Sequence, residues 1–241
     1  MPAQGNGSSR PVEPSRRAVV LGGLGAVAAG LGTVAAAGPA AAATTYRRGD
    51  RGAGVTSLQR RLSAAGYWCG RADGVFGHLT QQAVWAVQKR NGLVRDGVAG
   101  PRTSNALAHG GVLAPVGGSG SRVEVNLARQ LVVVVRNGRT TRMLNTSTGN
   151  GRPYTYNGRT YYANTHRGRF TVYSTYSAGW QWGPLGSLYR PMYFDGGIAL
   201  HGSMSIPPYP DSHGCARLST AAMDLVWSSG DLRMGSRVLV Y

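Results

Sequence analysis

The hydrophobic periodicity of the chain changes once, and this change constrains the fold more than any other feature of the sequence. Over residues 46–113, apolar side chains recur every three or four positions, as in amphipathic helices. After residue 121, Val123, Val125 and Leu127 alternate with polar residues, as in half-buried strands. The segment between, 114–121, is rich in Gly and Ser, and we expect a flexible linker there. The sequence therefore predicts a multidomain chain: a small all-α helical bundle over 46–113, then a mainly β domain over 122–241.

A short repeat marks two turns of the predicted bundle. Residues 73–80 and 96–103 share the pattern D-G-V-x-G-x-x-T. Glycine permits the backbone angles of a tight turn, and we expect Thr80 and Thr103 to cap the helices that follow. Two such units make a bundle of about 65 residues. We interpret the turns as scaffold rather than as ligand-binding loops.

The β domain is predicted from short apolar runs and turn signals. The run 131–135 is typical of a buried strand, and Asn137-Gly138 favours a hairpin turn into a strand over 140–146. One helix is expected over about 220–228, with Ser219 or Thr220 as its N-cap and Gly230 beyond its end. Further strands are expected at 170–173 and 238–241.

The chain is strongly basic. It has 26 Lys and Arg against 9 Asp and Glu, a formal net charge of +17, and Lys89 is its single lysine. The charge is spread over both predicted domains and implies an anionic partner, either nucleic acid or an anionic surface. With 42% hydrophobic residues the chain can bury a core, which excludes wholesale disorder. Two cysteines exclude a multi-disulfide scaffold and a four-cysteine zinc site.

Residues 1–43 have the organisation of a signal peptide. The basic pair Arg16-Arg17 precedes an uncharged run over 18–43 that ends in alanines. The arginine pair is similar to a twin-arginine export signal. The run is also long enough for a retained membrane helix, which stays an alternative. An exported protein meets anionic wall polymers, so we expect no nucleic-acid partner and only transient membrane contact through the signal segment.

A histidine and a cysteine lie close together in the second half of the β domain. Strand alternation places Ile198 and Leu200 on one face, and Ala199 and His201 on the other. Cys215 follows a glycine in a turn where backbone N–H groups can converge on one point. A thiol beside an imidazole suits nucleophilic acyl transfer: the imidazole takes the proton, the ionised sulfur attacks a carbonyl, and turn N–H groups bind the oxyanion.

Two other uses of the cysteines follow from residue type alone. The first is a zinc site, although a spacing of two residues along the turn strains the convergence of its ligands. The second is a Cys69–Cys215 disulfide, which would disable the nucleophile. We expect a free thiol at Cys215 and an apolar filler at Cys69. The ligands of the zinc alternative are Asp211, His201, His213 and Cys215.

Both halves of the chain resemble known families of cell-wall proteins. Residues 46–113 resemble the peptidoglycan-binding type 1 domain, and residues from about 123 to 241 resemble the L,D-transpeptidase (YkuD) catalytic domain. The first resemblance rests on Leu58-Gln59-Arg60-Arg61-Leu62, the repeat at 73–80 and Ala83-Val84…Gln88…Gly92-Leu93. The second rests on His201-Gly202…Ser212-His213-Gly214-Cys215-Ala216-Arg217, supported by segments 147–149, 165–170, 186–192 and 197–199. His78 and His166 stand where these families often have proline.

The catalytic-domain resemblance implies acyl transfer on peptidoglycan stem peptides, without a metal or cofactor. Cys215 would attack the carbonyl of the third stem residue, release the terminal D-Ala, and pass the acyl group to an amine of a neighbouring stem as a 3→3 cross-link. His201 would donate and accept the proton, with His213 and Gly214 in the oxyanion site. Exchanged roles of the two histidines stay an alternative. The residues expected to bind substrate are Arg217, Gly197, Ser203 and Tyr193.

The surroundings of the nucleophile leave further alternatives. Arg217 binds a substrate carboxylate or braces the loop, and Gly202 and Ser203 are expected to orient His201. The aromatic, Gly-rich segment 180–194 is expected to be a loop with partial substrate contact. Water or a free D-amino acid as acceptor would make the chain a carboxypeptidase or an exchange enzyme. A decayed site would leave a non-catalytic wall-binding protein.

Overall fold

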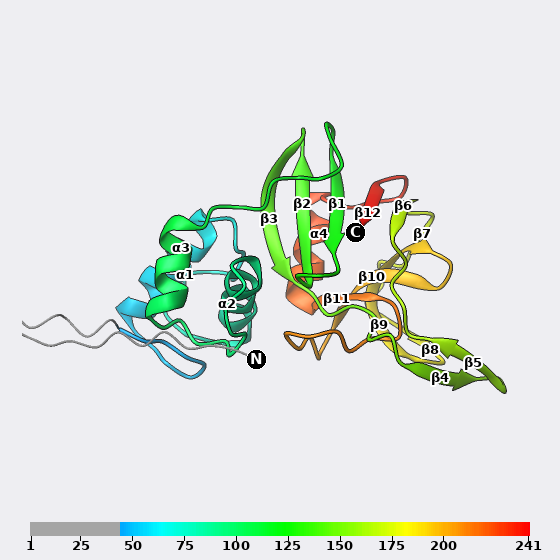
Figure 1. Cartoon of the computed structure of the whole chain (residues 1–241), viewed down its shortest axis with the longest axis horizontal. Coiled ribbons are helices and arrows are strands. Elements are labelled where there is room, and N and C mark those ends of the chain that lie inside the picture. The colour runs from blue at the N-terminus through cyan, green and yellow to red at the C-terminus, as the bar shows by residue number, and fades with distance from the viewer. Residues whose placement is uncertain (1–43) are drawn as a thin grey trace, which may run out of the picture. The chain divides into compact units, whose positions relative to one another are not determined.

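A helical module precedes a β-rich module, as the periodicity predicts (Figure 1). A computed structural model describes residues 44–241, which belong to one compact unit, and the predicted signal segment 1–43 lies outside the described residues. None of the helices within 44–241 is long and apolar enough to cross a membrane. These helices are α1 (Ala53–Ala64), α2 (His78–Arg90), α3 (Pro101–His109) and α4 (Thr220–Ser229).

The strands within the same range are β1 (Arg122–Asn126), β2 (Leu131–Arg136), β3 (Arg139–Asn145), β4 (Pro153–Tyr156), β5 (Arg159–Tyr162), β6 (Gly168–Thr171), β7 (Ser174–Thr175), β8 (Trp180–Gly183), β9 (Gly186–Asp195), β10 (Ile198–Ser203), β11 (Ala216–Ser219) and β12 (Arg237–Val240). One sheet has the order β3-β2-β1-β12-β6; the other has the order β11-β10-β9-β7, with β8 paired to β9. β4 and β5 form a separate hairpin. The parallel pair β10–β11 needs a long crossover, and that crossover, 204–215, ends at Cys215.

Several elements lie where the sequence predicts them. The strands expected after residue 121 are present as β1, β2, β3, β6 and β12, with β6 beginning two residues earlier than expected. Ser219 is the N-cap of α4, because its Oγ accepts the Ala222 N–H at 3.1 Å. Gly230 follows the helix in the left-handed conformation, with φ 63°. Local capping signals therefore suffice for this helix.

Buried glutamines hold the two repeated turns, and the predicted threonine caps are wrong. The Nε2 atoms of Gln59 and Gln88 each lie 2.6–3.2 Å from an Asp oxygen, a Val carbonyl and a Thr hydroxyl of one turn. Thr80 and Thr103 lie inside α2 and α3 as part of these networks, and glycines occupy the N-cap positions. Each threonine hydroxyl instead contacts the side-chain amide of a glutamine that is distant in the sequence, and a local pattern cannot predict that contact. Because the turn groups are satisfied within the module, the structure supports the interpretation as scaffold.

The sheet that contains β1, β2 and β3 is apolar on both faces. Leu131, Val133 and Met143 pack into the core of the helical module. Val132 and Leu144, on the opposite face, pack with α4 and the second sheet. Alternate residues of a strand point to opposite faces, so the continuous apolar run of β2 requires a cover on each side. The helical module is one of these covers and closes the core of the β-rich module.

The segment 114–121 is not a flexible linker, contrary to the expectation from its composition. Val116 and Gly117 donate their N–H groups to the Glu124 carboxylate at 3.0–3.1 Å. Arg122 pairs with the same carboxylate at 2.6 Å and donates to the carbonyl of Gly118 at 2.9 Å. Gly and Ser set only the intrinsic stiffness of a chain. Here a buried ion pair supplies partners that fix the backbone.

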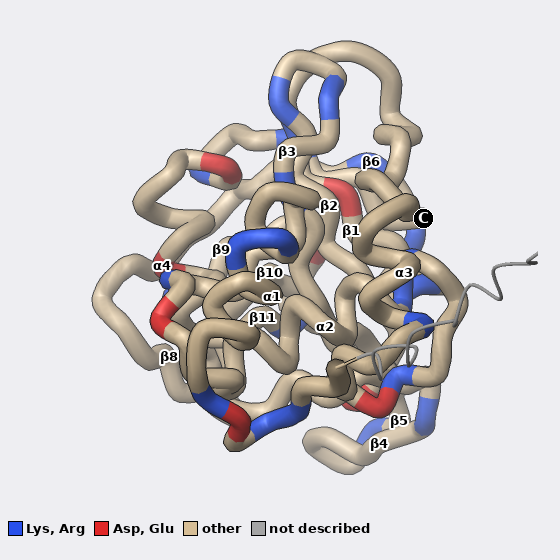
Figure 2. The backbone as a smooth tube through the Cα atoms, turned by 90° about the vertical axis from the view of Figure 1, so that its left-hand side faces the viewer, with Lys and Arg blue, Asp and Glu red and all other residues tan. Residues whose placement is uncertain are grey.

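The positive charge is distributed over both modules. Figure 2 shows blue positions in the helical and the β-rich parts, and few red ones. Acidic side chains are used in internal pairs: Glu124 lies beside Arg122, and Asp231 lies between Arg136 and Arg142. Arginine therefore contributes most of the surface charge, and the arginines are not concentrated in one segment.

We predict that Met143→Ala lowers the free energy of unfolding by about 2–5 kcal/mol, because Met143 is fully buried between the two modules. Thermal unfolding followed by far-ultraviolet circular dichroism and by tryptophan fluorescence should give one coincident transition at a lower temperature. The exposed Arg139 on the same strand provides the control, and Arg139→Ala should leave the transition within about 0.5 kcal/mol of wild type. Two separated transitions would show that the modules fold independently.

Candidate active site

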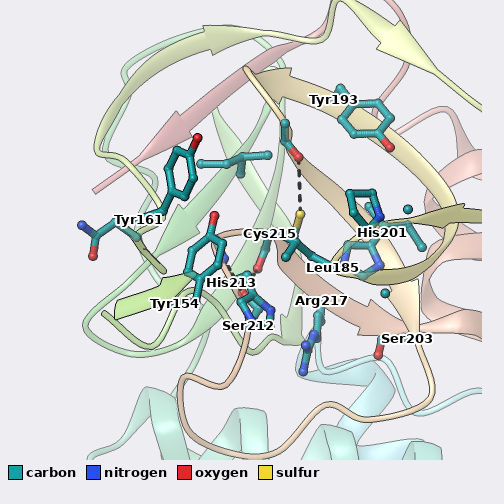
Figure 3. A pocket seen from close by; sticks show the side chains of 18 of the residues that line it. Tyr154, Tyr161, Leu185, Tyr193, His201, Ser203, Ser212, His213, Cys215 and Arg217 are labelled. Carbon is teal, nitrogen blue, oxygen red and sulfur yellow. Dashed lines mark hydrogen bonds between the residues drawn. The ribbon is translucent and has the colours of Figure 1, made fainter. Parts of the chain in front are cut away.

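A cavity of about 840 Å³ is lined by the residues predicted to catalyse the reaction and to bind substrate. Its wall is formed by β10, the start of β11, the β4–β5 hairpin and the tip of the β8–β9 hairpin. In Figure 3, Cys215 lies between Tyr154 and His213 on one side and His201 and Tyr193 on the other. The predicted residues in the wall are Tyr193, Gly197, His201, Ser203, His213, Gly214, Cys215 and Arg217.

The turn that carries Cys215 is held by the hydroxyl of Ser212. Ser212 Oγ accepts the Gly214 N–H at 3.0 Å and donates to the Cys215 carbonyl at 2.6 Å. Gly214 has φ 144°, and a Cβ at this position would lie 2.9 Å from the Asn164 carbonyl oxygen, so glycine is required. The carbonyl of Thr148 accepts the Ser212 N–H at 2.9 Å, which fixes the turn to the segment after β3.

The sulfur of Cys215 contacts two backbone groups of the β9–β10 region. Sγ accepts the Ala199 N–H at 3.4 Å and donates to the Gly197 carbonyl at 3.7 Å. Burial raises the pKa of the Cys215 thiol above its ordinary value, while the Ala199 N–H and the Arg217 charge lower it by less. The resting sulfur is therefore a neutral thiol at neutral pH. A neutral thiol must lose its proton to a base before the sulfur can attack.

His201 is buried, and its tautomer is fixed. Its Nδ1 lies 2.8 Å from the Gly202 carbonyl, and a carbonyl only accepts, so Nδ1 carries the hydrogen and Nε2 keeps a lone pair. Burial lowers the pKa of His201 to about 4, so the ring is neutral at pH 7. His201 lies two positions after Ala199 on β10 and lines the same cavity as Cys215. Within residues 44–241, no hydrogen bond joins the two side chains directly.

One of the backbone N–H groups expected to bind the oxyanion, that of Gly214, already has a partner within the turn. The Gly214 N–H is already bound to Ser212 Oγ, so the prediction that it faces substrate is wrong for this structure. The hydrogen bonds of the described residues include none from the backbone N–H groups of His213 and Cys215. The His213 ring packs edge-on against Tyr154, with centroids 4.9 Å apart. These two N–H groups are the available donors of the turn.

Arg217 and Ser203 each have a hydrogen-bond partner in the segment that joins β10 to β11. Arg217 donates from Nη1 to Asp211 at 3.2 Å while it lines the cavity, so it braces the loop before the turn. Ser203 donates from Oγ to the Ser205 carbonyl, whereas the Gly202 carbonyl is the hydrogen-bond partner of the His201 ring among residues 44–241. Gly202 thus orients His201, and the expectation for the Ser203 hydroxyl is not met.

Strand irregularities change which residues of β10 face the cavity. Ile198 lines the cavity together with His201, although strict alternation predicts opposite faces. The β9–β10 register shifts between Ile198 and Ala199 and again between Leu200 and Gly202. Each shift turns part of the strand relative to its partner, so the simple period of two fails in this strand.

The tyrosine-rich wall of the cavity was not predicted. Tyr154 and Tyr161 are paired across the β4–β5 hairpin and stack with centroids 5.7 Å apart. The signal that was present is Asn157-Gly158 between residues typical of strands, which favours a two-residue hairpin. Tyr154 therefore packs against both Tyr161 and the His213 ring in the wall of the cavity.

The segment 180–194 is a regular β8–β9 hairpin, not the predicted loop. Trp180 packs against Tyr189 with centroids 5.2 Å apart, and Phe194 is buried in the core. Tyr193 lines the cavity and donates to Gln181 at 2.8 Å, whereas Trp182 is 82% exposed. The aromatic residues therefore divide between core, cavity and surface, because cross-strand pairing outweighs the local glycine signal.

The two cysteines lie in different modules, and the residues of the zinc alternative do not gather into a metal site within residues 44–241. Cys69 is a free thiol buried in the core of the helical module, where its Sγ donates to the Gln59 carbonyl. Cys215 is also free. Over residues 44–241, no three side chains of His, Cys, Asp or Glu converge as metal ligands would. Asp211 instead pairs with Arg217.

Comparison with known proteins gives two family matches and several relatives. The L,D-transpeptidase catalytic domain family matches residues 120–240, and a peptidoglycan binding domain family matches residues 51–107. The crystal structure of the L,D-transpeptidase from Xylanimonas cellulosilytica is 48% identical, with a TM-score of 0.79, over 84% of this chain and 99% of that chain.

Two curated relatives match over shorter regions. The N-acetylmuramoyl-L-alanine amidase CwlL of Bacillus licheniformis is 45% identical over 67 residues, which is 27% of this chain and 19% of that protein. The spore cortex-lytic enzyme of Bacillus cereus is 43% identical over 61 residues, or 25% of this chain and 24% of that protein. The chain thus spans less than a quarter of the length of these relatives.

We predict that His201 makes stability depend on pH in acid. Its pKa is about 4 in the folded chain against an ordinary 6.5, so the unfolded chain binds the proton more readily between these values. Stability is present above pH 6.5 and falls by up to about 3 kcal/mol as the pH drops to 4. Urea unfolding of wild type and His201→Gln across this range should show the difference narrowing towards acid. A constant difference would contradict a buried, neutral imidazole.

We also predict that Cys215 alkylates slowly at neutral pH. In a Cys69→Ala background, the rate with iodoacetamide should rise with pH and reach its midpoint above the ordinary thiol pKa, because only the thiolate reacts. Mass spectrometry of the modified peptide measures the rate at each pH. A rate already at its plateau by pH 7 would mean that the resting sulfur is ionised.

Proposed function

We propose that this chain, which belongs to the L,D-transpeptidase catalytic domain family, uses Cys215 as the nucleophile of acyl transfer on peptidoglycan stem peptides. The observation that carries the proposal is the combination in one cavity of a thiol, a neutral imidazole with a free Nε2, and turn N–H groups. These are the three parts that cysteine acyl transfer requires.

The first half-reaction forms a thioester. As Sγ attacks the carbonyl carbon of the third stem residue, its proton passes to His201 Nε2, and the carbonyl oxygen takes up negative charge. We assign the binding of this oxyanion to the backbone N–H groups of His213 and Cys215, because the Gly214 N–H is already bound to Ser212. His201 then returns the proton to the amide nitrogen, the C–N bond breaks, and D-Ala leaves with a neutral amine.

The second half-reaction transfers the acyl group. An amine of a neighbouring stem attacks the thioester carbon, His201 accepts a proton from the nitrogen, and the C–S bond breaks. The sulfur leaves as a thiolate and recovers its proton from His201, so the site returns to its neutral starting state. The product is an amide, the 3→3 cross-link, and neither step consumes a cofactor.

The division of roles between the histidines follows from their contacts. The Gly202 carbonyl fixes the His201 ring with one nitrogen free, as a base needs. The His213 ring packs against Tyr154, and its backbone lies in the turn, which suits a structural role beside the oxyanion. These contacts favour His201 as the proton carrier over the exchanged assignment.

Substrate binding is proposed for the polar rim of the cavity. Arg217 reaches the cavity from the Asp211 pair, and its charge is placed to attract a stem carboxylate. The spread arginine charge of both modules would hold the protein near anionic wall polymers. A peptidoglycan substrate and an extracytoplasmic location follow from the two matched families. Export by a twin-arginine signal is the proposed route.

We predict that Cys215→Ala lowers the rate of D-Ala release from a stem tetrapeptide by at least about a thousandfold, because no other group replaces the nucleophile. Cys69→Ala, which removes the buried thiol outside the cavity, should keep the wild-type rate. Chromatography of released D-Ala, with mass spectrometry of products in the presence of an acceptor stem, makes both measurements. Equal activity of wild type and Cys215→Ala would refute the assignment, and hydrolysed tripeptide without cross-link would identify a carboxypeptidase.

A further inference from the structure

The single lysine of the chain is buried where the two modules meet. Lys89, near the end of α2, is 1% exposed, and its Nζ donates to the carbonyls of Gln130 at 2.9 Å and Thr146 at 2.8 Å. Burial lowers the pKa of Lys89 to about 6. Burying an amine is unfavourable unless its hydrogen bonds are made. Both carbonyls belong to the β-rich module. The buried amine of Lys89 therefore makes its hydrogen bonds across the boundary between the two modules.

One of these carbonyls belongs to a residue in an unusual conformation. Gln130 has φ 58°, in the left-handed region that residues other than glycine rarely adopt. Its side chain donates to Thr148 Oγ1 at 2.7 Å and accepts the Thr148 N–H at 2.9 Å. Lys89 thus binds the backbone carbonyl of Gln130, and Thr148 binds its side chain.

Thr148 continues this connection into the turn of the nucleophile. Its carbonyl accepts the N–H groups of Asp211 at 3.0 Å and Ser212 at 2.9 Å. Ser212 Oγ in turn binds both Gly214 and Cys215. Four consecutive hydrogen-bonded contacts therefore lead from a lysine of the helical module to the residue that carries the sulfur.

A second connection reaches the crossover before the turn. Arg95, which follows α2, donates from Nη1 to the Pro208 carbonyl at 2.9 Å. Gln82 on α2 donates to the Ile206 carbonyl at 3.3 Å and accepts from Asn145 Nδ2 at 2.5 Å. The helical module therefore contacts the 204–211 segment directly, at two carbonyls that lie between His201 and Cys215 in the sequence.

We propose that the helical module is a positioning element of the active site, in which Lys89, Gln82 and Arg95 hold the 204–215 crossover and so fix Cys215 relative to His201. The inference rests on the proposed function of Cys215 and extends it to residues of the wall-binding module. Displacement of a catalytic group by about 1 Å can cost a hundredfold in rate, and residues that orient a reactive group typically account for about 10- to 100-fold.

The test compares Lys89→Met and Arg95→Gln with a control, Arg102→Gln, at an exposed arginine of α3 that has no part in the site. On D-Ala release, Lys89→Met should lower kcat about 10- to 100-fold and Arg95→Gln about 3- to 10-fold, with KM within about twofold. Arg102→Gln should match wild type. Activity is measured well below each melting temperature, where a role in stability alone would leave kcat unchanged.

Alkylation of Cys215 supplies a readout that does not depend on the proposed reaction. Loosening the crossover relaxes the burial that raises the thiol pKa, so iodoacetamide at pH 8 should label Cys215 at least about threefold faster in Lys89→Met and Arg95→Gln. If wild type releases no D-Ala, the proposed function fails, and these rates still test the positioning. Arg95 is partly exposed, so Arg95→Gln carries the test if Lys89→Met does not fold. Wild-type kcat and labelling in the folded variants would overturn the inference.

Discussion

The constraint on which the structure depends is the sheet β3-β2-β1, which is apolar on both faces. One face is covered by α4 and the second sheet, which also carries β10 and His201. The other face is covered by the helical module. This double cover keeps α2 against the loops that follow β1 and β3, where Lys89 meets Gln130 and Thr146. The helical module is therefore part of the packed framework around Cys215, and not a domain joined to the β-rich module by a linker alone.

Burial shifts the pKa values of Cys215 and His201 in opposite directions. It raises the pKa of the Cys215 thiol and lowers the pKa of His201, so both are neutral in the resting site. In the proposed reaction, an ion pair would form only during attack, when the turn N–H groups can bind the developing oxyanion. Such a site has little thiolate available for oxidation, and it keeps the imidazole in the form that accepts a proton.

The sequence predicts what depends on local pattern. The strands of the first sheet, the Ser219 cap and the pair His201 and Cys215 follow from periodicity, capping and motif, because neighbours in sequence determine them. The ordered 114–121 segment depends on Glu124, and the position of Thr80 depends on Gln59. The loss of the Gly214 donor depends on the conformation of the turn around Ser212. These features require partners or angles that a linear pattern does not contain, and they can be read only after the chain is folded.

Capture of the thioester tests the central claim most directly. The protein is incubated with a stem tetrapeptide without an acceptor amine, quenched in acid and digested, and the acylated peptide is sequenced by mass spectrometry. The account predicts a tripeptide acyl group on the peptide that contains Cys215, lost on treatment with hydroxylamine. Turnover of the tetrapeptide with the acyl group on another residue, or with no covalent intermediate under any quench condition, would contradict it.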